Sequence, residues 1–172
     1  ACLEDWIPYL QELLEKFNIK KVKKIVPGGA SGQESIYNGL KAAEEIAGGE
    51  KSIVLIHDGV RPLINAKTIT DNIESVKKHG SSITCVKVKE TVLVVAEDNS
   101  IEDVPNRADT RLARAPQSFY LDEIIGAHRK AIAENKHDFI DSCSMMQYYG
   151  KKLYLIEGPQ ENIKITTPDD FY

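Results

Sequence analysis

The chain has 172 residues, 42% of them hydrophobic and 28% charged, a composition typical of a globular protein with one domain-sized core. Its net charge of −4 disfavours nucleic acid as a partner, because binding to a phosphate backbone usually requires a basic face. No apolar run approaches the ~20 residues that cross a bilayer. Cys2, Cys85 and Cys143 have no disulfide or zinc-site spacing, which indicates reduced thiols in a cytoplasmic protein.

The N-terminal part of the chain predicts two helices separated by a short strand. Asp5 is placed to cap a helix with apolar residues at helical spacing, and residues 22–26 are β-rich. Ser31 and Glu34 have the spacing of a capping box, which predicts the start of the second helix. Gly48 predicts the end of that helix, because glycine readily adopts the left-handed conformation that closes helices.

Residues 53–56 form a continuous aliphatic run, which is typical of a parallel strand buried on both faces. A polar loop follows, and then a helical pattern that Gly80 closes. This alternation predicts an α/β fold with an open, mainly parallel sheet flanked by helices.

A hairpin arm is predicted next, outside the alternation of strands and helices. Residues 83–89 and 91–95 are β-rich, residues 97–100 have turn composition, and a β-rich segment returns at 101–104.

The last third of the chain predicts two helices and two strands. The helices would cover residues 121–135 and 142–149, and the strands 152–156 and 163–166. The spacing of the first helix places four side chains on its inner face, namely Ile124, Ile125, His128 and Ile132.

The first candidate site is the loop His57-Asp58-Gly59-Val60-Arg61-Pro62, directly after the aliphatic strand. Open α/β sheets bind ligands beyond the carboxyl ends of their strands. Asp58 suits a metal ion or a hydroxyl group, and Arg61 suits a phosphate. An ion pair between Asp58 and Arg61 that only shapes the turn is an equal alternative, and we expect His57 to be structural.

The second candidate site is Asn162-Ile163-Lys164-Ile165-Thr166-Thr167. Lys164 interrupts an apolar–polar alternation, so its side chain faces either solvent or a cleft. Thr167, followed by Pro168 and two acids, has the form of a helix start with a capping hydroxyl.

Two further groups leave alternatives open. Three arginines, Arg107, Arg111 and Arg114, suit either phosphate oxygens or a subunit interface. The run Gly28-Gly29-Ala30, with Ser31 and Ser35, either presents backbone amides to a base or phosphate or forms a plain tight turn.

In chain order, GGASGQES, HDGVRP, VPNR with APQSF, and NIKITTPDD resemble the cytidylyltransferases that act on 2-C-methyl-D-erythritol 4-phosphate and ribitol 5-phosphate. The resemblance implies one Rossmann-like nucleotidyltransferase domain over residues 1–172. A protruding β-arm at about residues 88–112 would build a homodimer. It also implies that the family's N-terminal nucleotide loop and C-terminal helix are not among these residues, so we expect the 172-residue chain alone to be inactive.

The resemblance assigns roles on the nucleotide side of the site. Gly29, Ala30 and Ser35 would surround the cytosine of CTP, and Asp58 would lie near the ribose and bind Mg²⁺.

It assigns further roles on the phosphate side. Arg61 and Thr91 would lie along the polyol-phosphate pocket, and Lys164 would contact the reacting phosphates. Arg107 would reach the substrate phosphate of the partner subunit. Asp58, Arg107 and Lys164 would therefore be the catalytic residues.

The implied reaction joins CTP and a polyol phosphate to give a CDP-polyol and pyrophosphate, as in isoprenoid or teichoic acid biosynthesis. HDGVRP and Pro105-Asn106-Arg107 favour ribitol 5-phosphate. Gly32 and Ala115 stand where many members have Arg and Thr, which affects the substrate side. The alternatives are a non-catalytic dimeric module of the same fold and a His-Asp metal-dependent phosphohydrolase.

Overall fold

The computed structural model describes residues 1–171, which form two compact units. The first unit comprises Ala1–Val54 and Phe119–Lys152, and the second comprises Leu55–Ser118 and the chain from Leu153 onward. Four strands form one sheet in the order β1-β5-β2-β6, and a second sheet contains β3 and β4. The predicted α/β class is therefore confirmed. No helix within residues 1–171 is long and apolar enough to cross a membrane.

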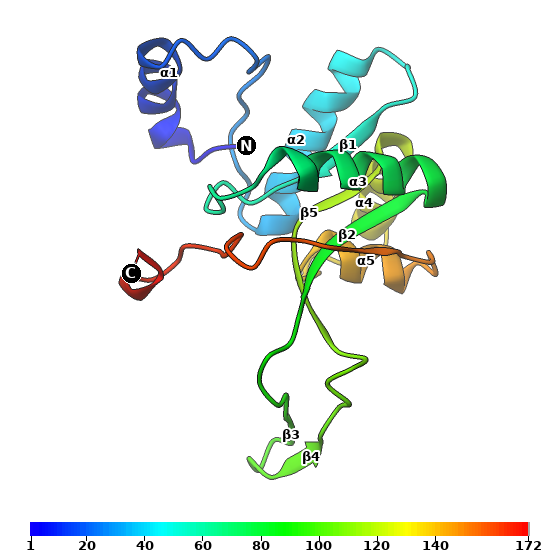
Figure 1. The fold of residues 1–172 in the computed structure, drawn as a ribbon. Helices are drawn as coiled ribbons and strands as arrows, with labels where there is room; N and C mark the ends of the chain where they lie inside the picture. Colours follow the sequence, from blue (N-terminus) through cyan, green and yellow to red (C-terminus); the bar gives the residue numbers. More distant parts are fainter. Residues whose placement is uncertain (172) are drawn as a thin grey trace. The chain divides into compact units, whose positions relative to one another are not determined.

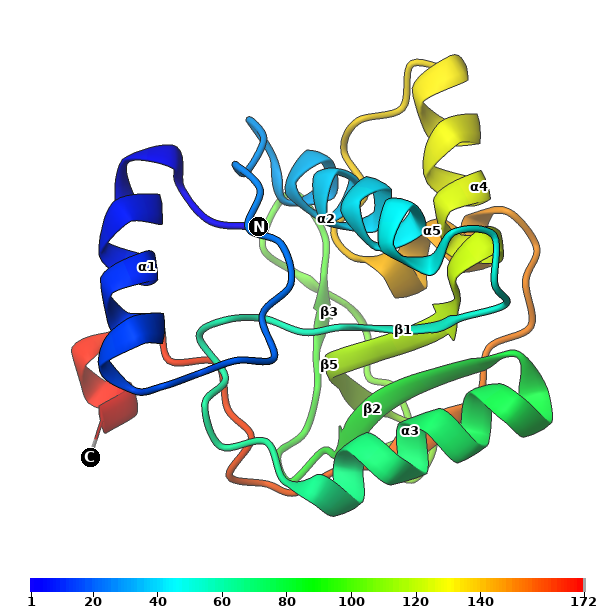
Figure 2. The same cartoon turned by 90° about the horizontal axis from the view of Figure 1, so that it is seen from above.

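The first unit begins with a 3-10 turn, η1 (Glu4–Trp6), and helix α1 (Ile7–Lys16). The cap residue of α1 is Trp6, without a side-chain hydrogen bond, so the predicted capping by Asp5 is wrong: the 3-10 turn includes Asp5 itself. The predicted strand at 22–26 is also wrong, because only an isolated bridge between Cys2 and Pro27 forms beside it. Both ribbon views show α1 apart from α2 and α4 (Figures 1 and 2).

Helix α2 (Gly32–Ala47) starts and ends where the sequence predicts. The Ser31 hydroxyl accepts a 3.1 Å hydrogen bond from the amide of Glu34. The Glu34 carboxylate, however, accepts from the amide of Ala30 instead of Ser31, so only half of the capping box forms. Gly48 closes the helix in the left-handed conformation, with φ of 57°.

The core of the first unit lies along α2, α4 (Leu121–Ala133) and α5 (Ser142–Tyr148). The predicted inner face of α4 is confirmed for Ile124, Ile125 and His128, which are buried. Ile132 is 44% exposed, and Ala131 is the buried residue of that last turn. The prediction fails at Ile132 because this side chain lines an open cavity between α2 and α4.

In the second unit, helix α3 (Ala66–His79) packs on β2 (Ser81–Lys87) and β6 (Leu155–Glu157). The strands β2 and β6 pair in parallel, with Ile83 opposite Leu155. Gly80 closes α3 with φ of 85°, as predicted. Figure 2 shows α3 running alongside β2.

Two expectations about strands need correction, and one strand is absent from the sequence-based prediction. Strand β1 (Ile53–Ile56) forms, but all four of its residues are half-buried instead of fully buried. The expected strand at 163–166 is extended chain without a regular ladder. The sheet also contains β5 (Arg111–Tyr120), a strand that its arginines and Pro116 conceal in the sequence.

The predicted hairpin forms from β3 (Val94–Val95) and β4 (Ile101–Asp103), which pair antiparallel. Its turn is closed by the amide of Ala96, which donates to the carbonyl of Ser100 at 3.0 Å, and by Asn99 with φ of 67°. Figure 1 shows the hairpin at the far end of the segments that continue β2 and precede β5.

Candidate functional site

The two candidate motifs lie against each other within the second unit. The amide of Ile165 donates a 2.9 Å hydrogen bond to the carbonyl of Val60. Arg61 Nη1 donates a 3.0 Å bond to the carbonyl of Asn162. Segments about a hundred positions apart in the sequence therefore form one local structure.

The Asp58–Arg61 ion pair, one of the two alternatives for this loop, is present. Arg61 Nε lies 2.9 Å from Asp58 Oδ2, and the amide of Arg61 donates to the carbonyl of Asp58 at 3.0 Å. The Arg61 side chain is 11% exposed and that of Asp58 is 39% exposed. Asp58 thus shapes the turn while its second oxygen, Oδ1, accepts no hydrogen bond from residues 1–171.

His57 closes the same loop. Its Nε2 lies 2.9 Å from the carbonyl of Arg61, and since a carbonyl can only accept, Nε2 carries the proton. Nδ1 is buried and has no hydrogen-bond partner in the described chain. This geometry favours the structural role expected of His57.

Asn162 connects the second motif to β5. It is 0% exposed, and its Nδ2 donates a 2.8 Å hydrogen bond to the carbonyl of Ala115. The sequence placed Asn162 in the motif without giving it a role. An amide side chain at the head of an otherwise apolar segment is the signal that would have indicated a buried hydrogen bond.

Lys164 is exposed and forms no hydrogen bond or ion pair with residues 1–171. The segment after it ends in a 3-10 turn, η2 (Pro168–Phe171). The predicted capping by the Thr167 hydroxyl is wrong: Asp170 Oδ2 accepts from the amides of Thr166 and Thr167, both at 2.7 Å. These hydrogen bonds lower the pKa of Asp170 from its ordinary value.

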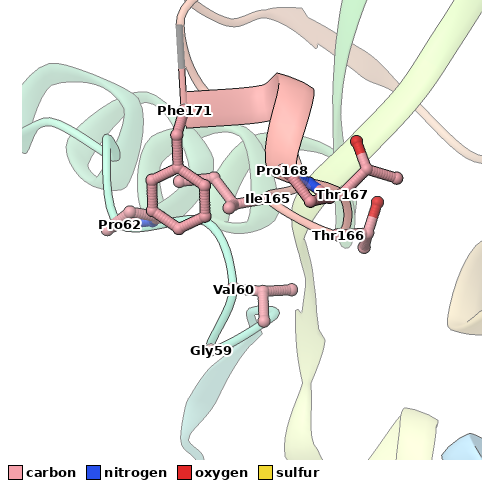
Figure 3. A pocket seen from close by; sticks show the side chains of 8 residues that line it. All are labelled: Gly59, Val60, Pro62, Ile165, Thr166, Thr167, Pro168 and Phe171. Atoms are coloured by element: carbon pink, nitrogen blue, oxygen red, sulfur yellow. The ribbon is translucent and has the colours of Figure 1, made fainter.

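A cavity of about 680 Å³ lies where the two motifs meet. In Figure 3, Pro62, Ile165 and Phe171 group on one side, with the hydroxyls of Thr166 and Thr167 on the other. The remaining lining residues are Gly59, Val60 and Pro168. The cavity is mainly apolar, and Asp58, Arg61 and Lys164 are sequence neighbours of its lining residues without lining it themselves.

Thr91 and Arg107 lie on the two opposing segments of the arm and are both exposed. Arg107 Nη1 donates a 3.1 Å hydrogen bond to the carbonyl of Lys89, which joins these segments. Within the described chain, no hydrogen bond or ion pair links Thr91 or Arg107 to Asp58, Arg61 or Lys164.

The other two arginines of the predicted cluster differ in their contacts. Arg111 Nη1 donates to the carbonyls of Ala108 and Thr110, both at 2.8 Å and both in its own turn. Arg114 Nη1 donates a 3.1 Å bond to the carbonyl of Gln160, just before the second motif. The structure therefore brings Arg114, and not Arg111, to the motif.

In the first unit, Gly29 and Ala30 lie just before α2, and Ser35 lies in the first turn of that helix. The amide of Gly29 donates to Ser35 Oγ at 3.0 Å, and that of Ala30 donates to Glu34 Oε2 at 2.7 Å. Both amides thus have side-chain partners in the first turn of α2. The Ala30 amide becomes available to a ligand only when the exposed Glu34 side chain moves.

The described residues contain no group of three or more His, Cys, Asp or Glu side chains that could hold a metal ion. A single carboxylate such as Asp58 suits Mg²⁺, which is commonly held by one or two carboxylates together with substrate phosphates.

Comparison with known proteins supports the resemblance. A model of the family described as IspD: 2-C-methyl-D-erythritol 4-phosphate cytidylyltransferase matches residues 2–172. The chain is 52% identical to the ribitol-5-phosphate cytidylyltransferase of Streptococcus agalactiae serotype V, over 100% of this chain and 71% of the relative. It is 40% identical to the 2-C-methyl-D-erythritol 4-phosphate cytidylyltransferase of Clostridium botulinum strain 657, over 99% of this chain and 72% of the relative.

A solved structure shares the fold. The 4-diphosphocytidyl-2C-methyl-D-erythritol synthase from Anaerococcus prevotii matches with a TM-score of 0.87 and 28% identity, over 98% of this chain and 74% of that one. The match supports the predicted nucleotidyltransferase fold. The chain belongs to the 2-C-methyl-D-erythritol 4-phosphate cytidylyltransferase (IspD) family.

Proposed function

We propose that this protein is a CTP-dependent cytidylyltransferase that joins CTP to ribitol 5-phosphate, giving CDP-ribitol and pyrophosphate. The observation that carries the proposal is the hydrogen-bonded meeting of the two motifs, which places Asp58, Arg61 and Lys164 on adjoining segments. The choice of substrate is supported by the higher identity to relatives named for ribitol 5-phosphate than to those named for 2-C-methyl-D-erythritol 4-phosphate. The latter substrate is the second candidate.

The reaction requires positioning and charge neutralisation more than proton transfer. A phosphate oxygen of the polyol phosphate attacks the α-phosphorus of CTP, and the bond from that phosphorus to the departing pyrophosphate breaks. The attacking monoester is largely dianionic at neutral pH, so no general base is needed. Cationic groups aimed at the phosphates provide the catalysis.

Arg61 and Lys164 provide these cations in different ways. Arg61 is held at Nε by Asp58 and at Nη1 by Asn162, so its guanidinium is oriented before substrate binds. The exposed Lys164 ammonium is a mobile point charge that reaches the reacting phosphates. Asp58 would hold Mg²⁺ through its second carboxylate oxygen. The ion, when bound, would neutralise charge on the phosphates.

The remaining assignments follow the family resemblance. Gly29, Ala30 and Ser35 bind the cytosine, and Thr91 contacts the polyol phosphate. Arg107 contacts the substrate phosphate of the partner subunit, in a homodimer formed through the arm. The exposed apolar side chains of the arm support an interface there, among them Leu93, Val95, Ile101 and Val104. The protein acts in the cytoplasm.

The test measures pyrophosphate release by the full-length protein with CTP, Mg²⁺ and ribitol 5-phosphate and, separately, with 2-C-methyl-D-erythritol 4-phosphate as the second substrate. We expect a higher kcat/KM with ribitol 5-phosphate. A higher value with the erythritol phosphate would reverse the choice of substrate. Release with neither would favour the non-catalytic module.

A further inference from the structure

Arg114 and Arg61 are anchored to the same turn of the chain. Arg114 Nη1 donates to the carbonyl of Gln160 at 3.1 Å, and Arg61 Nη1 donates to that of Asn162 at 3.0 Å. The Asn162 side chain returns a 2.8 Å hydrogen bond to the carbonyl of Ala115, the neighbour of Arg114. These three bonds hold both arginine side chains at residues 160–162, the segment that directly precedes Lys164 in the sequence.

The positive charge of this pair is only partly compensated. Asp58 pairs with Arg61, whereas no carboxylate of residues 1–171 lies in ion-pair distance of Arg114. Arg114 is half-buried, and burial, followed by the nearby charge of Arg61, lowers the pKa of its guanidinium. Two neighbouring cations of which only one is paired with a carboxylate form a stable arrangement when an anion joins them.

The contact with Gln160 uses few of the hydrogen-bond donors of the Arg114 side chain. A guanidinium has five N–H donors, and the contact with Gln160 uses only Nη1. The remaining donors have the planar arrangement that matches the oxygens of a phosphate. Arg111, on the same strand, is held more fully by its own turn, because its Nη1 donates to two carbonyls, those of Ala108 and Thr110.

We propose that Arg114 is a further substrate-binding residue, which together with Arg61 holds a phosphate group of a substrate. This inference rests on the proposed cytidylyl transfer and adds a residue to its site. The phosphate comes either from the polyol phosphate or from CTP, since both present the same oxyanion.

The test compares Arg114→Gln and Arg114→Lys with the matched control Arg111→Gln. Isothermal titration measures the binding of ribitol 5-phosphate, CTP and inorganic phosphate in separate arms, and thermal unfolding gives Tm. Arg114→Gln should weaken binding about 10- to 100-fold, the equivalent of losing a charged hydrogen bond. Arg114→Lys should recover part of the loss because it restores the charge. The control and every Tm should stay at the wild-type value.

The outcomes separate the phosphate sources and the role of Arg114. A loss confined to ribitol 5-phosphate assigns the arginine pair to the polyol phosphate, and a loss confined to CTP assigns it to the nucleotide. Unchanged binding of all three ligands overturns the proposal. A lower Tm with equal losses for every ligand, and no recovery by lysine, also overturns it, since that is the behaviour of a structural contact with Gln160.

Pyrophosphate release by the full-length wild-type protein separates this inference from the proposed function. Turnover by wild type with unchanged kinetics in Arg114→Gln refutes the arginine pair alone. Absence of turnover, with inorganic phosphate binding weakened in Arg114→Gln, refutes the cytidylyl transfer and retains the anion site.

Discussion

The side chain of Asn162 donates a 2.8 Å hydrogen bond to the carbonyl of Ala115, and this bond joins the second motif to β5 inside the protein. The carbonyl of Asn162 in turn accepts from Arg61. One buried residue thus connects the strand, the motif and Arg61.

Replacement of Asn162 by Ala should lower the free energy of unfolding by about 1–3 kcal/mol, because the buried carbonyl of Ala115 loses its donor. Urea unfolding measures the change. Asn38→Ala is the control, since Asn38 donates to the carbonyl of Pro27 at the surface and should cost about 0.5 kcal/mol or less. Equal losses in the two variants would contradict a special role for Asn162.

Replacement of Lys164 by Ala should reduce kcat about 100-fold or more, because one of the cations at the reacting phosphates is lost. The side chain is exposed and forms no hydrogen bond or ion pair with residues 1–171, so Tm should not change. Lys67→Ala, which removes an exposed lysine paired with Asp71 on α3, should retain wild-type turnover. Wild-type kcat in Lys164→Ala would remove Lys164 from the catalytic residues.

Mixed dimers test whether Arg107 acts on the partner's site. Subunits with Arg107→Ala and subunits with Lys164→Ala should each be nearly inactive alone. Random reassociation should restore roughly a quarter of wild-type activity, because half of the dimers contain one site with both residues intact. No recovery on mixing would place Arg107 and Lys164 in the same subunit's site.

His128 should make stability depend on pH. Its imidazole is 1% exposed, and burial lowers its pKa from 6.5 to about 4. The unfolded chain therefore binds more protons between these values, so the free energy of unfolding falls as the pH decreases from 6.5 to 4. The loss is on the order of 2 kcal/mol, allowing for solvent screening.

The measurement for His128 is the difference in unfolding free energy between wild type and His128→Leu over this pH range. His137→Leu is the control. His137 is exposed, lines the cavity between α2 and α4 together with His128, and hydrogen-bonds Asn135. A parallel pH dependence in wild type and His128→Leu would exclude His128 as the source.

The local elements of the fold could be predicted because their signals lie within a few residues. Gly48 and Gly80 close α2 and α3 in the left-handed conformation, which glycine adopts at little steric cost. The turn at 97–100 also follows from its own residues, since Asp98 Oδ1 accepts from the amide and hydroxyl of Ser100. Such features depend on residues close together in the sequence and need no hydrogen-bond partner from a distant segment.

The strand at Arg111–Tyr120 and the extended segment at 163–166 could not be predicted from local pattern. A strand is defined by the neighbour that receives its backbone hydrogen bonds, and β5 has partners on both sides in the order β1-β5-β2. The 163–166 segment alternates like a strand, yet its Ile165 amide bonds the loop carbonyl of Val60 instead of a ladder.

The sequence by itself determined which two segments are candidates for the site, since HDGVRP and NIKITT stand out by their order and residue types. Only the tertiary structure decided how they meet. Arg61 donates a hydrogen bond to the carbonyl of Asn162, and Arg114 donates one to the carbonyl of Gln160. The physical reason is the separation in sequence between the residues that form each hydrogen bond. Capping and turn hydrogen bonds link residues within one or two turns, whereas the bonds that align Arg61 and Arg114 require segments far apart in sequence to fold together first.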